Sequence, residues 1–141
     1  MARGSNSKVD LIKSVPLFEH CSKSELAKIA QSADELDLRE GKVLIREGER
    51  GREFFVIASG NVEVTRMGKP VATLGPGDFI GEMALLSNIP RSATVTALTP
   101  LDVLVITDRG FKGLLDRMPS LWPKLAKALA ERIARDENSS A

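Results

Sequence analysis

The residues best suited to chemistry are an acid and an arginine nine positions apart. The acid, Glu82, follows Gly81 and opens the run Glu82-Met83-Ala84-Leu85-Leu86, and the arginine, Arg91, precedes Ser92-Ala93. An arginine guanidinium can give two parallel hydrogen bonds to a phosphate or a carboxylate. An ionised glutamate only accepts hydrogen bonds, so it can bind a sugar hydroxyl. Together with backbone N–H groups at the start of a turn, this pair predicts a pocket for a sugar that carries a phosphate.

Two interpretations of the pair are open at the level of spacing. In the first, Arg91 neutralises a phosphate while Glu82 accepts hydrogen bonds from neighbouring hydroxyls. In the second, the two residues form a structural ion pair beside a turn. To choose between the two interpretations, it is necessary to know which helices, strands and turns position Glu82 and Arg91.

The composition indicates one globular domain of ordinary size. The chain has 141 residues, 43% of them hydrophobic and 28% charged, with a net charge of +1 from 20 basic and 19 acidic side chains. This balance argues against a broad surface for nucleic acid or membranes. No apolar run approaches the roughly 18 residues of a membrane span, and residues 1–10 lack the apolar core of a signal peptide. We therefore expect a cytoplasmic protein with no membrane segment in this chain and no direct contact with nucleic acid.

The chain has one cysteine, Cys21, and one histidine, His20. One cysteine excludes an internal disulfide and argues against a cysteine-ligated iron–sulfur cluster, and the two residues together are too few for a His/Cys zinc site. One histidine also gives no set of nucleophile, base and orienting group. We therefore expect neither an enzyme nor a metal site, and we expect His20 and Cys21 to be packing or surface residues.

The first part of the chain predicts a polar lead and then a helix. Residues 1–10 are predicted to be disordered. The run Ser22-Lys23-Ser24-Glu25 matches a capping box and predicts a helix through Ala30. Leu17 and Phe18, just before it, are predicted to pin this helix to the core.

Between about residues 35 and 107 the pattern changes to short strands separated by turns. Phe54-Phe55-Val56-Ile57 and Val62-Glu63-Val64-Thr65 flank Ser59-Gly60, which is typical of a hairpin. Many short strands at this spacing predict an antiparallel barrel or jelly roll. Five glycines are predicted to supply positive φ angles at turns: Gly41, Gly48, Gly51, Gly60 and Gly68.

The helical pattern returns from residue 108 to about residue 135. Asp108 is predicted to cap one helix and Ser120 a second, in which Pro123 lies in the tolerated first turn. Residues 136–141 are predicted to form a polar tail. The second helix carries an apolar stripe: Leu121, Leu125, Leu129 and Ile133.

Several motifs in this order resemble the cyclic-nucleotide-binding domain family, of the type found in catabolite activators and regulatory subunits of protein kinase A. Gly81-Glu82-Met83-Ala84-Leu85-Leu86 and Pro90-Arg91-Ser92-Ala93-Thr94-Val95 resemble its phosphate-binding cassette. Residues 46–62 resemble its glycine-rich strand–turn–strand, and Gly75-Pro76-Gly77-Asp78-Phe79 resembles the lead-in to the cassette. Asp108-Arg109-Gly110-Phe111 resembles the start of the helices after the barrel. The resemblance covers about residues 11–135, which are expected to form one domain.

The resemblance implies a fold that is mainly β with flanking α: an antiparallel β jelly-roll barrel with an N-terminal helix and C-terminal lid helices. It implies a cyclic 3′,5′-nucleotide in the barrel pocket, with Arg91 on the cyclic phosphate and Glu82 on the ribose 2′-hydroxyl. The N–H groups of Gly81 and Ala84 and the hydroxyl of Ser92 are expected to assist. The expected binding site therefore consists of Gly81, Glu82, Met83, Ala84, Arg91, Ser92 and Ala93.

Ser92 leaves the identity of the nucleotide open. Family members that prefer cGMP often carry threonine after the arginine, and many cAMP kinases carry alanine. Serine is also seen in bacterial cAMP-dependent activators. We expect cAMP, with cGMP as the alternative. Trp122 is expected in the core or an interface, with stacking on the base as the alternative.

The resemblance implies a regulatory module that signals to a protein effector or a fused output domain by moving its C-terminal helices. Ala141 lies about six residues after the predicted last helix, so we expect no helix-turn-helix segment, kinase or channel pore in this chain. The exposed side of the last helix offers a surface for a partner or for a second copy of the chain. Two other classes stay open. One is a nucleotide-free protein–protein interaction domain of the same fold, and the other is a sensor of another ligand such as haem or an organic acid, with His20 as the one histidine for an iron.

Overall fold

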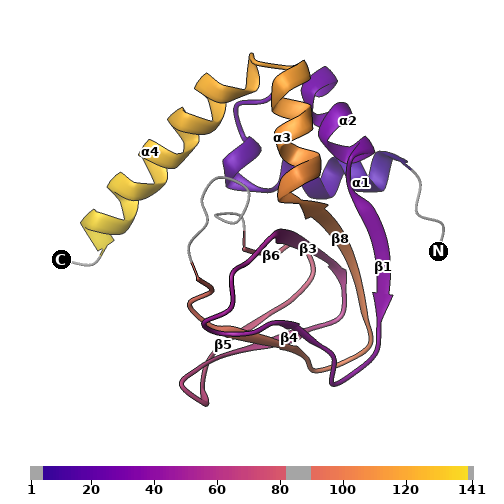
Figure 1. Cartoon of the computed structure of the whole chain (residues 1–141), viewed down its shortest axis with the longest axis vertical. Coiled ribbons are helices and arrows are strands. Elements are labelled where there is room, and N and C mark those ends of the chain that lie inside the picture. Colours follow the sequence, from indigo (N-terminus) through magenta and orange to yellow (C-terminus); the bar gives the residue numbers. More distant parts are fainter. Residues whose placement is uncertain (1–4, 82–89, 140–141) are drawn as a thin grey trace.

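The structure is a computed structural model of the 141-residue chain, and it describes residues 5–81 and 90–139. Helices gather at one end of the molecule and strands at the other (Figure 1). In chain order the helices are α1 (Ser5–Lys13), the short 3-10 helix η1 (Pro16–Phe18), α2 (Lys23–Gln31), α3 (Asp108–Arg117) and α4 (Leu121–Ser139). The strands are β1 (Asp34–Leu38), β2 (Val43–Ile45), β3 (Glu53–Ser59), β4 (Val62–Arg66), β5 (Lys69–Leu74), β6 (Phe79–Ile80), β7 (Thr94–Ala97) and β8 (Leu101–Thr107).

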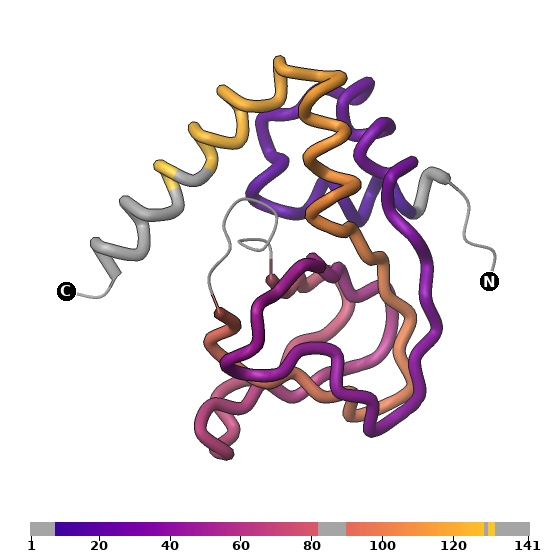
Figure 2. Tube along the Cα trace, viewed as in Figure 1, coloured from indigo at the N-terminus to yellow at the C-terminus, as the bar shows by residue number. Residues whose placement is uncertain are grey.

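The strands form two antiparallel sheets of four strands each. One sheet has the order β1-β8-β3-β6 and the other the order β2-β7-β4-β5. The first barrel strand pairs with the last, with Asp34 opposite Val105 and Leu38 opposite Leu101. These two strands therefore lie side by side although they are far apart in the chain (Figure 2). The predicted antiparallel jelly roll with flanking helices is confirmed, built from two sheets rather than one continuous closed sheet.

Strands β3 and β8 carry apolar side chains on both faces, and both faces are covered, one by the helices and the other by the interior of the barrel. Successive side chains of a strand point to opposite sides, so each strand contributes to two cores. The residues that pack against the helices are Phe54, Val56, Leu104 and Ile106. The residues that pack inside the barrel are Phe55, Ile57, Val103 and Val105. The continuous apolar runs in the sequence are therefore strands buried between the helices and the opposite sheet.

The predicted capping box at the start of α2 is confirmed. The Glu25 N–H donates to Ser22 Oγ (3.2 Å), and the Ser22 N–H donates to the Glu25 carboxylate (2.8 Å). Leu17 and Phe18 are buried in the helical core as predicted. The Phe18 ring lies 6.1 Å from the ring of Phe54, in an edge-on arrangement that links η1 to the barrel.

The segment predicted as a disordered lead, residues 1–10, holds most of helix α1 (Ser5–Lys13). Ile12 is fully buried in the helical core. Lys8 Nζ donates to the backbone carbonyl of Ala33 (2.8 Å), just after α2. Because most of the stability of a short helix comes from tertiary packing, the polar local sequence is a poor guide here.

The cap of α3 differs from the prediction, whereas Ser120 directly precedes α4. Thr107 is the N-cap of α3, since its Oγ1 accepts from the Gly110 N–H (3.0 Å), and Asp108 is the first helical residue. Ser120, predicted to cap α4, donates its hydroxyl to the carboxylate of Glu25 (2.8 Å). This bond ties the start of α4 to α2.

Helix α4 begins where predicted but is longer. It continues to Ser139 and so includes most of residues 136–141, the predicted polar tail. Of the predicted stripe, Leu121 and Leu125 are fully buried against the other helices. The side chains of Leu129 and Ile133 lie outside the described part of the structure.

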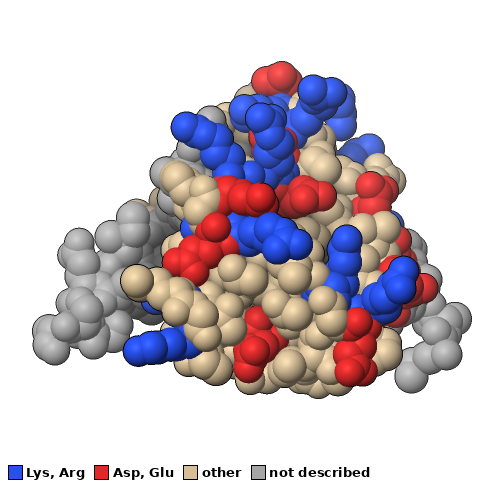
Figure 3. All heavy atoms as spheres, turned by 60° about the horizontal axis from the view of Figure 1, so that its bottom comes forward, with Lys and Arg blue, Asp and Glu red and all other residues tan. Residues whose placement is uncertain are grey.

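The surface carries both signs of charge. Acidic and basic side chains are interspersed over the face in Figure 3, as a net charge of +1 leads one to expect. Within residues 5–81 and 90–139, no helix combines the length and the apolar character needed to cross a membrane.

Candidate functional site

A cavity of about 350 Å³ lies between the two sheets, next to the segment that carries Arg91. This volume is within the range of small-molecule sites. Most of the lining is apolar, and the charged groups in it are both arginines. The lining residues are Ile45, Val64, Arg66, Leu74, Phe79, Ile80, Gly81, Arg91, Ser92, Ala93 and Val95. The cavity therefore suits a ligand with an apolar or aromatic body and an anionic group.

Two glycines shape the position of the Arg91 guanidinium. A methyl group on Gly51 or on Gly81 would overlap it. Gly81 also has a φ of +82°, which favours glycine. Gly51 has no such angle, so the prediction that it supplies a positive φ is wrong, whereas Gly41, Gly48, Gly60 and Gly68 do have positive φ angles. Gly51 is required for close approach, not for its backbone conformation.

The backbone of Arg91 is fixed by the loop that precedes β3. The Arg91 N–H donates to the carbonyl of Glu49, and the Gly48 N–H donates to the carbonyl of Arg91, both at 2.8 Å. Arg50 and Pro90 form an isolated antiparallel bridge beside these bonds. The predicted glycine-rich segment and the predicted arginine segment are therefore held together, 38 or more residues apart in sequence.

The side chain of Arg91 is half-buried and lacks a carboxylate partner among residues 5–81 and 90–139. One guanidinium nitrogen, Nη2, donates to the backbone carbonyl of Glu53 (2.6 Å). Burial lowers the pKa of Arg91, and the charge of Glu53 acts in the opposite direction. A guanidinium has five N–H donors, so among residues 5–81 and 90–139 this bond leaves most of its donor capacity for a ligand. The site favours an anion.

Arg66 is a second cation on the cavity wall that the sequence analysis missed. Its Nε donates to the backbone carbonyl of Ser92 (3.1 Å), so it also braces the segment after Arg91. The sequence feature that could have identified Arg66 is the two-residue period of β4. Val62, Val64 and Arg66 lie on the same side of this strand. The side chain of Ser92 is exposed at the cavity edge.

The structure brings together part of the predicted site. Gly81, Arg91, Ser92 and Ala93 line one cavity, and their roles in binding stay predictions. Glu82, Met83 and Ala84 lie outside the described residues, so their roles stay predictions. Of the described residues, Trp122 is not in the lining and is 49% exposed at the start of α4, so it is not in the expected core.

A match that covers the barrel and α3 identifies the family of the chain. The profile of the cyclic nucleotide-binding domain matches residues 35–118. The chain belongs to the cyclic nucleotide-binding domain family. This is a family of regulatory rather than catalytic domains, and the resemblance noted in the sequence is confirmed.

Relatives of this cyclic nucleotide-binding domain occur in longer regulatory proteins. The cAMP-dependent protein kinase regulatory subunit of Mycosarcoma maydis is 41% identical over 122 residues, which cover 80% of this chain and 23% of that protein. The chain spans about a quarter of the length of the curated kinase regulatory subunits it matches.

Solved structures agree with the fold. The N-terminal domain of a transcriptional regulator from Streptomyces coelicolor A3(2) has a TM-score of 0.83 and 30% identity, over 92% of this chain and 96% of that one. The regulatory domain of Toxoplasma gondii PKA, crystallised with cAMP, has a TM-score of 0.72 and 28% identity, over 78% of this chain and 44% of that one. The fold is therefore shared with a domain whose crystals contain cAMP.

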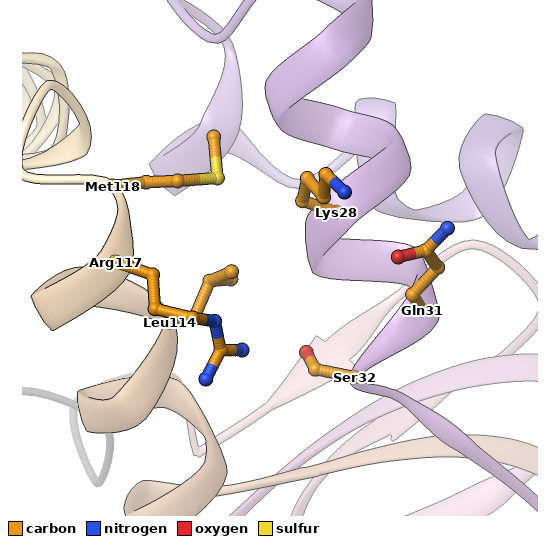
Figure 4. Close-up of a pocket in the computed structure, with 6 residues that line it drawn as sticks. All are labelled: Lys28, Gln31, Ser32, Leu114, Arg117 and Met118. Carbon is orange, nitrogen blue, oxygen red and sulfur yellow. The ribbon is translucent and has the colours of Figure 1, made fainter.

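A larger cavity, of about 510 Å³, lies away from the barrel site, between the ends of α2 and α3. Lys28, Gln31 and Ser32 line it from α2 and the residue after it, opposite Leu114 and Arg117 of α3 and the adjoining Met118 (Figure 4). Its two cations, Lys28 and Arg117, are exposed and have solvent as an alternative partner. The smaller barrel cavity, with its half-buried arginine, is the stronger candidate.

Proposed function

We propose that this domain is a cyclic-nucleotide sensor that binds cAMP, and cGMP more weakly, in the barrel cavity. The observation that carries the proposal is the placement of Arg91. Its guanidinium is half-buried at the wall of a largely apolar cavity, and among residues 5–81 and 90–139 it is held by a neutral carbonyl and by no carboxylate. A charged group in such a place is stabilised by an anion. A cyclic phosphate provides that anion, and the base and sugar fill the apolar space.

Each predicted residue has a defined task in this proposal. Arg91 binds the cyclic phosphate, assisted by the N–H groups of Gly81 and Ala84. Glu82 accepts a hydrogen bond from the ribose 2′-hydroxyl. The exposed Ser92 contacts the phosphate or the base, and Met83 and Ala93 complete the wall. The similarity to a kinase regulatory domain crystallised with cAMP supports this ligand.

The proposed output is a shift between two positions of the C-terminal helices. In the structure α4 stands to one side of the barrel (Figure 1). Nucleotide favours the state in which residues 81–86 are drawn in and α4 is closed over the cavity. The effect on a protein effector, a fused output domain or a second copy of the chain is limited by the difference in nucleotide affinity between the two states.

The test is a calorimetric titration with cAMP, cGMP and 5′-AMP after the protein has been unfolded and refolded to remove carried-over ligand. We expect saturable binding in the order cAMP, cGMP, 5′-AMP. Arg91→Ala should weaken binding at least about tenfold, the equivalent of 1.4 kcal/mol. Glu82→Ala should weaken it less, because it removes a contact to a neutral hydroxyl.

Arg39→Ala is the matched control for Arg91→Ala. It removes the same charge from an exposed position between β1 and β2 and should leave the affinity unchanged. Equal affinities for the wild type and Arg91→Ala would remove the phosphate role. No heat and no thermal shift up to millimolar nucleotide would instead favour the nucleotide-free interaction domain.

A further inference from the structure

Three potential ligand atoms meet between α4 and the residues that follow η1, and none of the three residues lines the barrel cavity. His20 Nε2 lies 2.7 Å from a carboxylate oxygen of Glu131 and 3.6 Å from a carboxylate oxygen of Glu19. The donor atoms of all three residues lie within 4.8 Å of one another. His20 and Glu131 are 111 residues apart in the chain, so folding alone brings them together.

These separations fit one small cation. Two donors that share a tetrahedral zinc ion, with bonds of about 2.0–2.2 Å, lie roughly 3.3–3.6 Å apart. The distance from His20 Nε2 to Glu19, 3.6 Å, lies at the upper end of this range, and the distance to Glu131, 2.7 Å, is that of a hydrogen bond that an ion would replace by a small side-chain movement. The three side chains are partly exposed, between 29% and 42%, which leaves a path for the ion and room for a water ligand.

The donor types also favour a transition-metal cation. Glu19 and Glu131 both face the same imidazole nitrogen, so an ion there meets one nitrogen donor and two carboxylate donors. Imidazole together with carboxylate is a ligand set for zinc and similar transition metals, whereas magnesium prefers oxygen donors alone. The count of cysteine and histidine in the sequence excluded a His/Cys zinc site, but it did not consider carboxylates brought in by the fold.

The surrounding structure holds two of the ligands in place. Glu131 lies on α4, whose Leu121 and Leu125 are fully buried in the same core as Phe18 of η1. His20 lies two residues after the end of η1, and the Cys21 N–H donates to the carbonyl of Phe18 (3.0 Å). The ligands therefore sit on packed elements, and a bound ion would fix α4 to the segment after η1.

We propose that Glu19, His20 and Glu131 form a binding site for zinc or a similar divalent transition-metal ion that fastens α4 to the N-terminal half of the chain. The role is structural, with a water as the fourth ligand. The observations that carry it lie outside the barrel cavity. A bound ion would hold α4 in its present position and so oppose the proposed closure by nucleotide, and the zinc and nucleotide titrations test the two proposals separately.

The test is a titration of the full-length, tag-free, chelator-treated chain with zinc chloride near neutral pH. We expect one zinc ion per chain and no competition from an excess of magnesium. His20→Ala should weaken zinc binding at least about tenfold, and Glu19→Gln and Glu131→Gln should each weaken it. Glu63→Gln on β4 removes one carboxylate elsewhere and should have no effect.

Cys21, next to His20, is a competing zinc ligand, so the experiment must distinguish its binding from that of the proposed site. The donor atoms that lie within 4.8 Å of one another come from Glu19, His20 and Glu131, and the Cys21 sulfur is not among them. Cys21→Ser should therefore bind zinc as the wild type does. Circular dichroism of each variant confirms that the fold is kept.

Three outcomes would overturn the proposal: no saturable zinc binding, binding that His20→Ala leaves unchanged, and binding that Cys21→Ser abolishes. The middle outcome identifies an adventitious surface site. Cobalt substitution gives a second readout, because its visible spectrum reports nitrogen and oxygen ligands without sulfur in the wild type. This spectrum should disappear in His20→Ala.

Discussion

The guanidinium of Arg91 lies where it does because two neighbouring residues have no side chain. Gly51 and Gly81 leave the space that it occupies, and the carbonyl of Glu53 holds it there. The arginine alone is therefore not sufficient for the site, and the glycine-rich loop before β3 is part of it.

Gly51→Ala tests this arrangement without changing any group that touches the ligand. The new methyl group would overlap the Arg91 guanidinium, and because that is the end of a flexible side chain, Arg91 moves while the fold is kept. We expect nucleotide affinity to fall about tenfold with little change in stability, since charge-assisted hydrogen bonds are lost or misdirected.

Gly113→Ala in α3 is the control for that substitution. Its methyl group would meet the Arg117 guanidinium at an ordinary contact distance of 3.7 Å. It should leave nucleotide affinity unchanged while favouring the helix slightly. Affinity in Gly51→Ala equal to that of the wild type would show that Arg91 binds nothing in its observed position.

At this scale the sequence predicted the charged residue but not its surroundings. Arg91 and Gly81 stand out in a local motif. Gly51 was assigned a turn conformation, because its close approach to Arg91 depends on pairing between segments almost 40 residues apart. Arg66 was missed for a related reason: which side of β4 faces a cavity depends on the opposite sheet.

Among the elements, the joint between α2 and α4 depends on one buried carboxylate. Glu25 is 5% exposed and accepts hydrogen bonds from Ser120 and Lys124 at the start of α4, in addition to its capping bond. Burial by itself raises the pKa of Glu25, but hydrogen bonds from Lys124, the Ser22 N–H and Ser120 outweigh it and lower the pKa to about 2. The charged form is therefore the one that stabilises the fold.

The pH dependence of stability follows from that direction. Because the pKa of Glu25 is lower in the folded chain than its ordinary value of 4.5, its contribution is complete above about pH 4.5 and is lost as the pH falls toward 2. The contribution is about 3 kcal/mol, most of it lost by about pH 3. Glu25→Gln should destabilise the chain by a comparable amount near neutral pH and by much less at pH ~3.

Urea denaturation of both proteins at the two pH values measures this difference. Glu35→Gln, at an exposed position of β1, is the control and should change stability little at either pH. A destabilisation by Glu25→Gln that is the same at both pH values would assign the effect to packing and not to the charge of the carboxylate.

The elements themselves were predictable where local chemistry specifies them. The capping box of α2 and the strands β3 and β8 follow from residue type and period. Helix α1 was missed because its sequence is polar and its stability comes from Ile12 and other tertiary contacts. The predicted cap of α3 was wrong by one residue because Thr107 and Asp108 are both residue types that cap helices. Which of them is the N-cap depends on the path of β8.

For the whole molecule, the proposed movement of α4 can be followed with the chain's single tryptophan. Trp122 lies at the start of α4 and is 49% exposed. If nucleotide draws α4 toward the barrel, the exposure of this indole changes, and we expect a shift in its emission spectrum on saturation with cAMP. Arg91→Ala should need at least about tenfold more cAMP for the same shift, in line with its weaker binding. Calorimetric binding without any spectral change would place the moving part elsewhere.

The pairing of β1 with β8 has a consequence for how the chain folds. Asp34 and Val105 are partners in the ladder, so the barrel is completed only when a loop of about seventy residues closes. Contacts between such distant segments make folding slow, typically on the millisecond to second scale. During synthesis, β1 and β3 are made before β8, the strand that lies between them. The barrel can therefore form only after β8 has been made, in a single late and cooperative step.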